Sequence, residues 1–122
     1  TEEGAKGKRD MKKILFYGMT GEKMCFQHIL LNALDLSNAG HEVKIIFEGA
    51  SVKLVSVFEA ESNPLYKKAK DAGIIAGICL ACSKMMDVIE QNEATGLPML
   101  SDMSGHAGMK HYMESGYEII SM

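Results

Sequence analysis

Short, almost continuous apolar runs alternate along this chain with segments in which apolar residues recur at helical spacing. Three of the runs, KKILFYG at residues 12–18, HEVKIIF at residues 41–47 and IIAGICL at residues 74–80, have the length of a strand. Few polar positions interrupt them, which is typical of parallel strands covered on both faces. Two shorter runs, at residues 97–101 and 117–122, predict further strands.

Helical spacing is clearest in residues 22–39, where an apolar stripe ends just before Gly40. Residues 50–60 are ambiguous, because their valines favour a strand by propensity. We interpret them as a helix, since their spacing also fits a helix and a connection between parallel strands needs one. Asn63 followed by Pro64 is typical of a helix cap and a first helical position, which predicts a second short helix.

Two more helices complete the pattern, one from Cys82 to about residue 93 and one over about residues 105–115, with Asp102 or Ser104 as its cap. The resulting order, βαβα(α)βαβαβ, predicts an α/β fold: a three-layer α/β/α sandwich around a mostly parallel five-stranded sheet. At 122 residues the chain has the size of one domain. We place this domain at residues 11–122 and expect residues 1–10 to be a flexible N-terminal tail. The pattern does not determine the order of the strands.

Charge and composition exclude several classes of function. The whole chain has a net charge of −3, and its first 13 residues carry five basic and three acidic side chains, so the rest is near −5. This leaves no basic patch for a phosphate backbone, and we expect no nucleic-acid binding. No apolar run approaches the roughly 18 residues of a membrane span. The N-terminus also lacks the apolar stretch of a signal peptide, so we expect a cytoplasmic protein without a membrane segment.

The most distinctive chemistry lies in residues 73–89, GIIAGICLACSKMMDVI, which predict a buried strand that delivers Cys82 to the first turn of a helix. The free N–H groups and the dipole of a helix start favour an anion, and such positions lower cysteine pKa values from about 8.5 to roughly 3.5–7.5. We therefore identify Cys82 as the candidate reactive thiol and expect it in an accessible position. The alternative is a buried packing residue, as many free cysteines are.

The run ACSKMMDV, read with the strand before it, resembles the cysteine-bearing segment of the DsrE/DsrF-like sulfur-transfer proteins, in which a variant of A-C-x-x-M-D follows the third strand. The resemblance extends over about residues 11–122. It implies a DsrE-like α/β fold and a cytoplasmic homo-oligomer without a bound cofactor. It also implies that Cys82 accepts a persulfide sulfur from a donor protein and passes it to an acceptor.

One departure from that family leaves the function open. The best-defined sulfur-relay members have an arginine-glycine pair after the cysteine, where this chain has the residues SKMM at positions 83–86. The departure leaves open which relay partner the chain would meet and whether it is a sulfurtransferase enzyme. A second interpretation is a non-enzymatic DsrE-like binding or assembly module, in which the cysteines are structural and the methionine-rich C-terminal half makes subunit contacts.

Cys79 and Cys82 form a C-x-x-C motif, CLAC, which suggests a third interpretation. Cys79 could be the resolving partner of Cys82 in a dithiol redox centre, or the pair could be half of a metal site. Because Cys25 and the four histidines are scattered, spacing assembles no four-ligand site, and we predict no metal and no cofactor. Cys25 is interpreted as packing. His106, near the start of the last predicted helix, could take the proton of Cys82 or pair with its thiolate.

Overall fold

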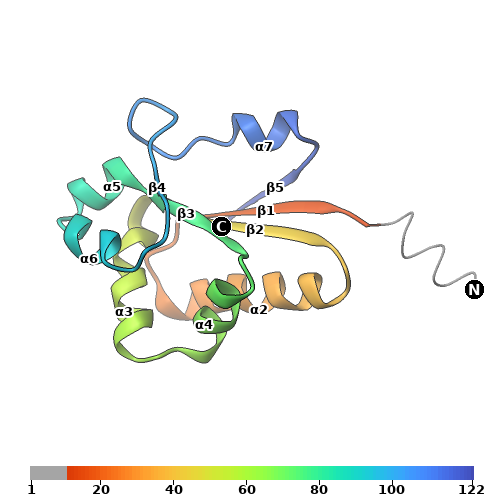
Figure 1. The fold of residues 1–122 in the computed structure, drawn as a ribbon, viewed down its shortest axis with the longest axis horizontal. Helices are drawn as coiled ribbons and strands as arrows, with labels where there is room; N and C mark the ends of the chain where they lie inside the picture. The colour runs from red at the N-terminus through yellow and green to blue at the C-terminus, as the bar shows by residue number, and fades with distance from the viewer. Residues whose placement is uncertain (1–10) are drawn as a thin grey trace, which may run out of the picture.

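A five-stranded sheet organises residues 11–122, the part of the chain that the computed structural model describes (Figure 1). The predicted N-terminal tail, residues 1–10, lies outside the described residues. The elements follow one another as β1 (Lys13–Gly18), α2 (Lys23–Asn38), β2 (Glu42–Phe47), η1 (Gly49–Lys53), α3 (Leu54–Ala60), α4 (Pro64–Asp71), β3 (Ile75–Cys79), α5 (Leu80–Met85), α6 (Ile89–Glu93), β4 (Met99–Leu100), α7 (Lys110–Glu114) and β5 (Glu118–Ser121).

The strand order is β4-β3-β2-β1-β5, and every neighbouring pair is parallel. This confirms the predicted α/β sandwich with a parallel sheet. The chain builds the sheet outward from β1 to β4 and then crosses to the opposite side of β1 to form β5. In Figure 1 the segment between β4 and α7 rises above the sheet near the end of β3 and then runs across to α7. Residues that follow β4 are thereby carried across the carboxyl ends of the other strands.

The main core lies between the sheet and the layer of α2, α3 and α4, which covers one face of the sheet in Figure 1. Phe26 of α2 stacks on Phe47 of β2 with ring centroids 4.4 Å apart, and Phe58 and Tyr66 extend the aromatic cluster. The opposite layer is thinner, since none of the α7 side chains is buried. The aromatic layer therefore holds the carboxyl end of β2 firmly in place.

The ambiguous residues 50–60 are helical, beginning with the 3-10 turn η1 and continuing as α3. Asn63 caps α4 as predicted, because its side-chain oxygen accepts hydrogen bonds from the backbone N–H groups of Leu65 and Tyr66. The helix interpretation of both segments is confirmed.

The two C-terminal helix predictions are wrong in their extent. The single helix expected from Cys82 to about residue 93 is two helices, α5 and α6, which are separated where Asp87 adopts a positive φ of 57°. The helix expected over residues 105–115 covers only Lys110–Glu114. Before it, the chain forms a tight turn in which Met103 and His106 exchange backbone hydrogen bonds. Neither Asp102 nor Ser104 caps α7; instead Asp102 accepts a hydrogen bond from the Gly108 N–H.

Candidate functional site

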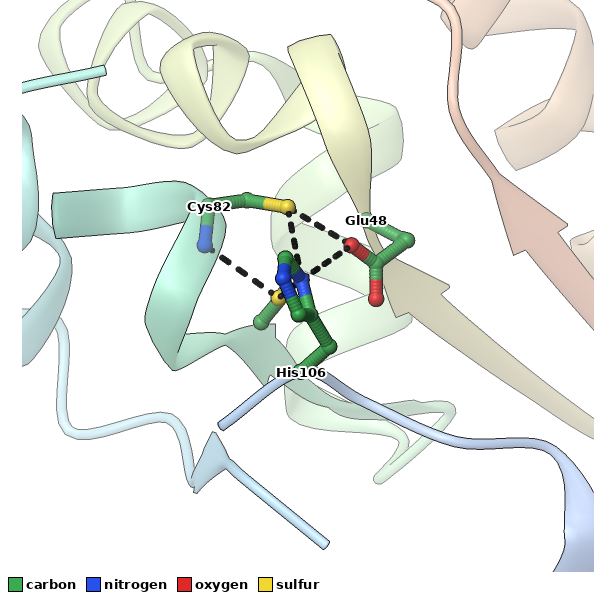
Figure 2. A group of neighbouring side chains, drawn as sticks. Glu48, Cys82 and His106 are labelled. Atoms are coloured by element: carbon green, nitrogen blue, oxygen red, sulfur yellow. Dashed lines mark hydrogen bonds and ion pairs between the residues drawn. The ribbon is translucent and has the colours of Figure 1, made fainter. Parts of the chain in front are cut away.

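Four side chains that carry chemistry meet at the carboxyl edge of the sheet: Glu48, Cys79, Cys82 and His106. Glu48 follows β2, Cys79 is the last residue of β3, Cys82 lies in α5, and His106 comes from the turn after β4. One donor atom of each lies within 4.8 Å of the others. Figure 2 shows the carboxylate, the sulfur of Cys82 and the imidazole converging. The register of the sheet explains why Glu48 and Cys79 are neighbours. Phe47 of β2 pairs with Ile78 of β3, which brings the next residue of each segment side by side.

Cys79 connects the strand to the helix. It is fully buried, and its sulfur accepts a hydrogen bond from the Cys82 backbone N–H at 3.3 Å, which caps α5. The spacing of the C-x-x-C motif produces this contact. Cys79 is the cap residue of α5, and the N–H of Cys82, three residues later, is one of the backbone groups at a helix start that lack a partner within the helix. Cys79 is therefore held directly beside the second thiol, as a resolving partner would need to be.

Cys82 is not the exposed, acidic thiol that the sequence predicts. It is 8% exposed, and its Sγ donates a hydrogen bond to Glu48 Oε1 at 2.7 Å. Burial raises the pKa of Cys82 to about 12, with further contributions from the hydrogen bond and the negative charge of Glu48. The predicted lowering of its pKa is wrong because desolvation and the carboxylate outweigh the N–H groups of α5, a helix of only six residues.

Glu48 is a buried carboxylate, 4% exposed, with each oxygen held separately. Oε1 accepts from the Gly49 N–H at 3.0 Å and faces the cluster, while Oε2 accepts from the Tyr17 hydroxyl at 3.1 Å and the Ala107 N–H at 3.2 Å. Burial by itself raises the pKa of Glu48, but the hydrogen bonds, with that from Cys82 the largest, hold it below its ordinary value. The proton they share therefore stays on the sulfur and the carboxylate is ionised.

His106 covers the two sulfurs. Its Nδ1 is 3.3 Å from Cys79 Sγ, 3.4 Å from Cys82 Sγ and 3.6 Å from Glu48 Oε1. Its side chain is 36% exposed, more than that of any other member of the cluster, so it separates the thiols from solvent. The structure places His106 beside Cys82, where the candidate role requires it, but in a turn rather than in a helix.

A second ring of buried polar residues fixes this geometry. The Ser83 hydroxyl donates to the Cys79 carbonyl at 2.7 Å, and Asn92 Nδ2 donates to Ser83 Oγ at 2.9 Å and to the Val52 carbonyl at 3.0 Å. These bonds tie α6, α5 and η1 together behind the cysteines. The break at Asp87 makes this possible, because it turns α6 back so that Asn92 points at the start of α5.

Sequence reasoning missed Glu48 and its support Tyr17. The only local signal for Glu48 is its position, an acidic residue directly after an apolar strand, and that signal points to no partner. Cys25, interpreted as packing, is exposed on α2. His111 lies on α7 against Tyr112 and is not part of the cluster.

Fold and site together define the class: an α/β protein with a parallel sheet and a buried Glu-Cys-Cys-His cluster at its carboxyl edge. The chain belongs to the family of uncharacterized protein MJ0733 of Methanocaldococcus jannaschii, to which it is 37% identical over 98 residues, 78% of this chain and 78% of that protein. No model of a known protein family matches the chain, and no solved structure matches it. Within residues 11–122, every helix is too short or too polar to cross a bilayer.

Proposed function

We propose that this protein is a sulfur carrier of the sulfurtransferase type, in which Cys82 accepts a sulfane sulfur as a persulfide and passes it to an acceptor thiol. The observation that carries the proposal is the pair of proton acceptors beside this sulfur, Glu48 Oε1 at 2.7 Å and His106 Nδ1 at 3.4 Å. Ligands of open parallel sheets bind beyond the carboxyl ends of the strands, where this cluster lies. The resemblance of ACSKMMDV to the DsrE/DsrF-like proteins supports the same chemistry.

Sulfur transfer to Cys82 is a thiol exchange that needs no oxidant. The Cys82 proton moves to His106 or Glu48, and the thiolate attacks the outer sulfur of a donor persulfide, R–S–SH. A new S–S bond forms on Cys82 as the S–S bond of the donor breaks, and the donor leaves as R–S⁻, which takes up the proton. An acceptor thiolate then attacks the outer sulfur of the Cys82 persulfide in the same way and regenerates Cys82.

The burial of Cys82 limits which donors can react. With its pKa raised to about 12, the thiol holds little thiolate at neutral pH, so the resting protein resists adventitious oxidation. A donor reaches the sulfur past His106, the more exposed member of the cluster. Loading therefore favours a donor that seats at this edge of the sheet over small oxidants in solution.

The position of Cys79 favours a second candidate, a dithiol redox function. Its sulfur lies within 4.8 Å of that of Cys82. If the Cys79 thiolate attacks the inner sulfur of a Cys82 persulfide, hydrosulfide leaves and a Cys79–Cys82 disulfide forms. The sulfane sulfur is then reduced by the two thiols, and an external dithiol must reduce the disulfide before the next cycle.

The proposal extends to the protein's assembly and surroundings. We place the carrier in the cytoplasm as a homo-oligomer that meets separate donor and acceptor proteins, as the family resemblance implies. Large exposed methionines, including Met24, Met85 and Met113, supply apolar surface for such contacts. The rival interpretation, an assembly module with structural cysteines, shares this surface but takes up no sulfur.

The test is sulfur loading followed by intact-mass measurement. The reduced protein, in a Cys25→Ser background that removes the exposed thiol, is incubated with inorganic polysulfide and freed of excess reagent. We expect a mass increase of one sulfur atom that maps to Cys82 and is absent from Cys82→Ser. Equal sulfur retention by Cys82→Ser would refute the carrier, and loss of two hydrogens without added sulfur would favour the dithiol candidate.

A further inference from the structure

We propose that Glu48, Cys79, Cys82 and His106 form a tetrahedral binding site for one thiophilic divalent metal ion, with Zn²⁺ as the ion that fits best. The inference goes beyond the proposed sulfur transfer and does not depend on it. It reverses our expectation, from sequence spacing, that the chain has no metal site. That expectation considered cysteines and histidines only, and it missed the carboxylate that the fold adds to the C-x-x-C pair.

The donor set is the first argument. Two cysteine sulfurs, an imidazole nitrogen and a carboxylate oxygen are all established zinc ligands. Thiolates select soft or borderline ions over Mg²⁺ and Ca²⁺, which prefer oxygen ligands alone. The C-x-x-C spacing is also the usual way in which one chain segment supplies two of the four ligands.

The distances are the second argument. Zinc bonds of about 2.3 Å to sulfur and about 2.0–2.2 Å to nitrogen and oxygen place tetrahedral ligand atoms roughly 3.3–3.8 Å from one another. His106 Nδ1 lies 3.3, 3.4 and 3.6 Å from Cys79 Sγ, Cys82 Sγ and Glu48 Oε1. The contact of 2.7 Å between Cys82 and Glu48 is shorter, because it is the thiol hydrogen bond that a metal would replace. Metal binding would move these two atoms about 1 Å apart. The other pairs of ligand atoms lie within 4.8 Å of one another, so small side-chain adjustments bring all four to one ion.

The surroundings of the ligands are the third argument. Metal-bound carboxylates and histidines are usually oriented by outer hydrogen bonds. The Tyr17 hydroxyl and the Ala107 N–H hold Oε2 of Glu48, which leaves Oε1 directed at the cluster. The Cys82 N–H points at the sulfur of Cys79, where it would stabilise a thiolate ligand. The ring of Ser83 and Asn92 fixes the backbone that carries both cysteines.

Charge is the fourth argument. A buried carboxylate is expected to be paired with a cation or to bind a metal. Within residues 11–122, no Lys or Arg forms an ion pair with Glu48, and the one basic side chain that contacts it is the imidazole of His106, with Nδ1 3.6 Å from Oε1. A divalent ion that replaces the protons on the two thiols leaves the net charge of the cluster unchanged, but it places a concentrated positive charge directly beside the Glu48 carboxylate. Since four protein ligands fill a tetrahedral shell, the site would be a closed one.

Metal binding is tested by titrating the reduced, metal-free full chain with Co²⁺ and displacing it with Zn²⁺. All proteins carry Cys25→Ser so that the exposed thiol cannot contribute. We expect one ion per chain, with the visible bands of tetrahedral cobalt and the near-ultraviolet charge-transfer band of cobalt–thiolate bonds. Zn²⁺ should abolish both signals. Absence of a stoichiometric complex, or an octahedral cobalt spectrum without a thiolate band, would overturn the proposal.

Single substitutions assign the ligands. Zinc affinity in chelator competition should fall by about 100-fold or more in each of the four ligand variants, Cys79→Ser, Cys82→Ser, His106→Gln and Glu48→Gln. Tyr17→Phe removes only the hydrogen bond to Glu48 Oε2 and should lower the affinity about tenfold. His111→Gln, on the exposed α7, is the matched control and should bind as the parent does. Unchanged affinity in either cysteine variant would exclude the site, and unchanged affinity in Glu48→Gln would overturn the four-ligand assignment.

A second measurement needs no variant in the cluster and so does not depend on whether the variants fold. Zn²⁺ should slow alkylation of Cys79 and Cys82 in the Cys25→Ser protein, and a chelator should restore the rate; rates that Zn²⁺ leaves unchanged would contradict the proposal. Because persulfide and metal use the same sulfur, Zn²⁺ should also block polysulfide loading. A protein that loads sulfur but binds no metal refutes this inference alone, and one that binds metal but loads no sulfur refutes only the proposed function.

Discussion

Asn92 offers the sharpest test of how the site is held, because it is fully buried and far from solvent on α6. Its amide nitrogen makes two hydrogen bonds, to the Val52 carbonyl and to Ser83 Oγ, and Ser83 in turn bonds to the Cys79 carbonyl. Replacement by alanine removes both bonds and leaves a cavity beside η1. We predict that Asn92→Ala destabilises the protein and loosens the cysteine segment at the same time.

The magnitude follows from the groups that are left behind. Each lost hydrogen bond costs about 0.5–1.5 kcal/mol, and the Val52 carbonyl, left buried without its partner, adds about 1–3 kcal/mol. Asn92 Oδ1 has no hydrogen-bond partner among residues 11–122, so its removal returns part of this cost. Ser83 keeps its bond to the Cys79 carbonyl. The balance is a loss of about 2–4 kcal/mol in the free energy of unfolding.

Urea denaturation followed by circular dichroism measures this loss as a lower midpoint at an unchanged m-value. Asn32→Ala is the matched control, because Asn32 also donates its amide to a backbone carbonyl, that of His28, but does so on the exposed side of α2. We expect less than about 0.5 kcal/mol there. A loss below about 0.5 kcal/mol for Asn92→Ala as well would show that the buried ring does not hold α5 and α6 in place.

The remaining predictions concern the cysteines, the sheet and one surface charge pair. In the metal-free protein, iodoacetamide should modify the exposed Cys25 at neutral pH long before Cys82, whose pKa is raised to about 12 by burial and by Glu48, and the rate for Cys82 should climb steeply with pH. Gly77→Ala should lower the thermal midpoint, because a Cβ there would lie 2.6 Å from a backbone oxygen just before β4 and would push this short strand off the sheet. The hydrogen bond from Lys70 lowers the pKa of Glu59 and burial raises it, and the net effect is a pKa below the ordinary 4.5. The ionised Glu59 therefore stabilises the folded protein above the pKa of the unfolded state, and this stabilisation is lost as the pH falls through the pKa of the folded state. Glu59→Gln should lower the free energy of unfolding by under about 1 kcal/mol at pH 7 and should leave it unchanged in acid.

Each of these has a simple contrary result. Peptide mapping that finds Cys82 modified as fast as Cys25 would contradict the burial argument. A thermal midpoint unchanged by Gly77→Ala would mean that β4 is free to move away without cost. A stability difference between Glu59→Gln and the parent that is the same at pH 3 and pH 7 would assign the effect to packing rather than to charge.

The elements that sequence patterns predicted correctly are those whose signal is local. The apolar runs that became β1, β2 and β3 are short and nearly continuous, and Asn63-Pro64 needs only its own neighbours to cap α4. The errors fall where distant contacts decide the structure. Helical spacing continues past Asp87, yet the chain breaks there because Asn92 gains buried partners on α5 and η1. Likewise the turn at His106 is held by a carboxylate from a distant segment, through the bond from the Ala107 N–H to Glu48, which follows β2.

The cluster itself is a consequence of strand order, which the hydrophobic pattern does not contain. Glu48 and Cys82 are 34 residues apart, and they meet because β2 and β3 are adjacent, with Phe47 opposite Ile78. His106 joins them because β5 pairs with β1 on the far side of the sheet, so that the connection from β4 must pass over the ends of β3 and β2. The reversed pKa of Cys82 has the same origin. Only the helix that follows the cysteine can be inferred locally, whereas the fold buries the sulfur and brings the Glu48 carboxylate to within 2.7 Å of it. Burial first, and then the contact with Glu48, raise the pKa of Cys82 and keep the proton on its sulfur.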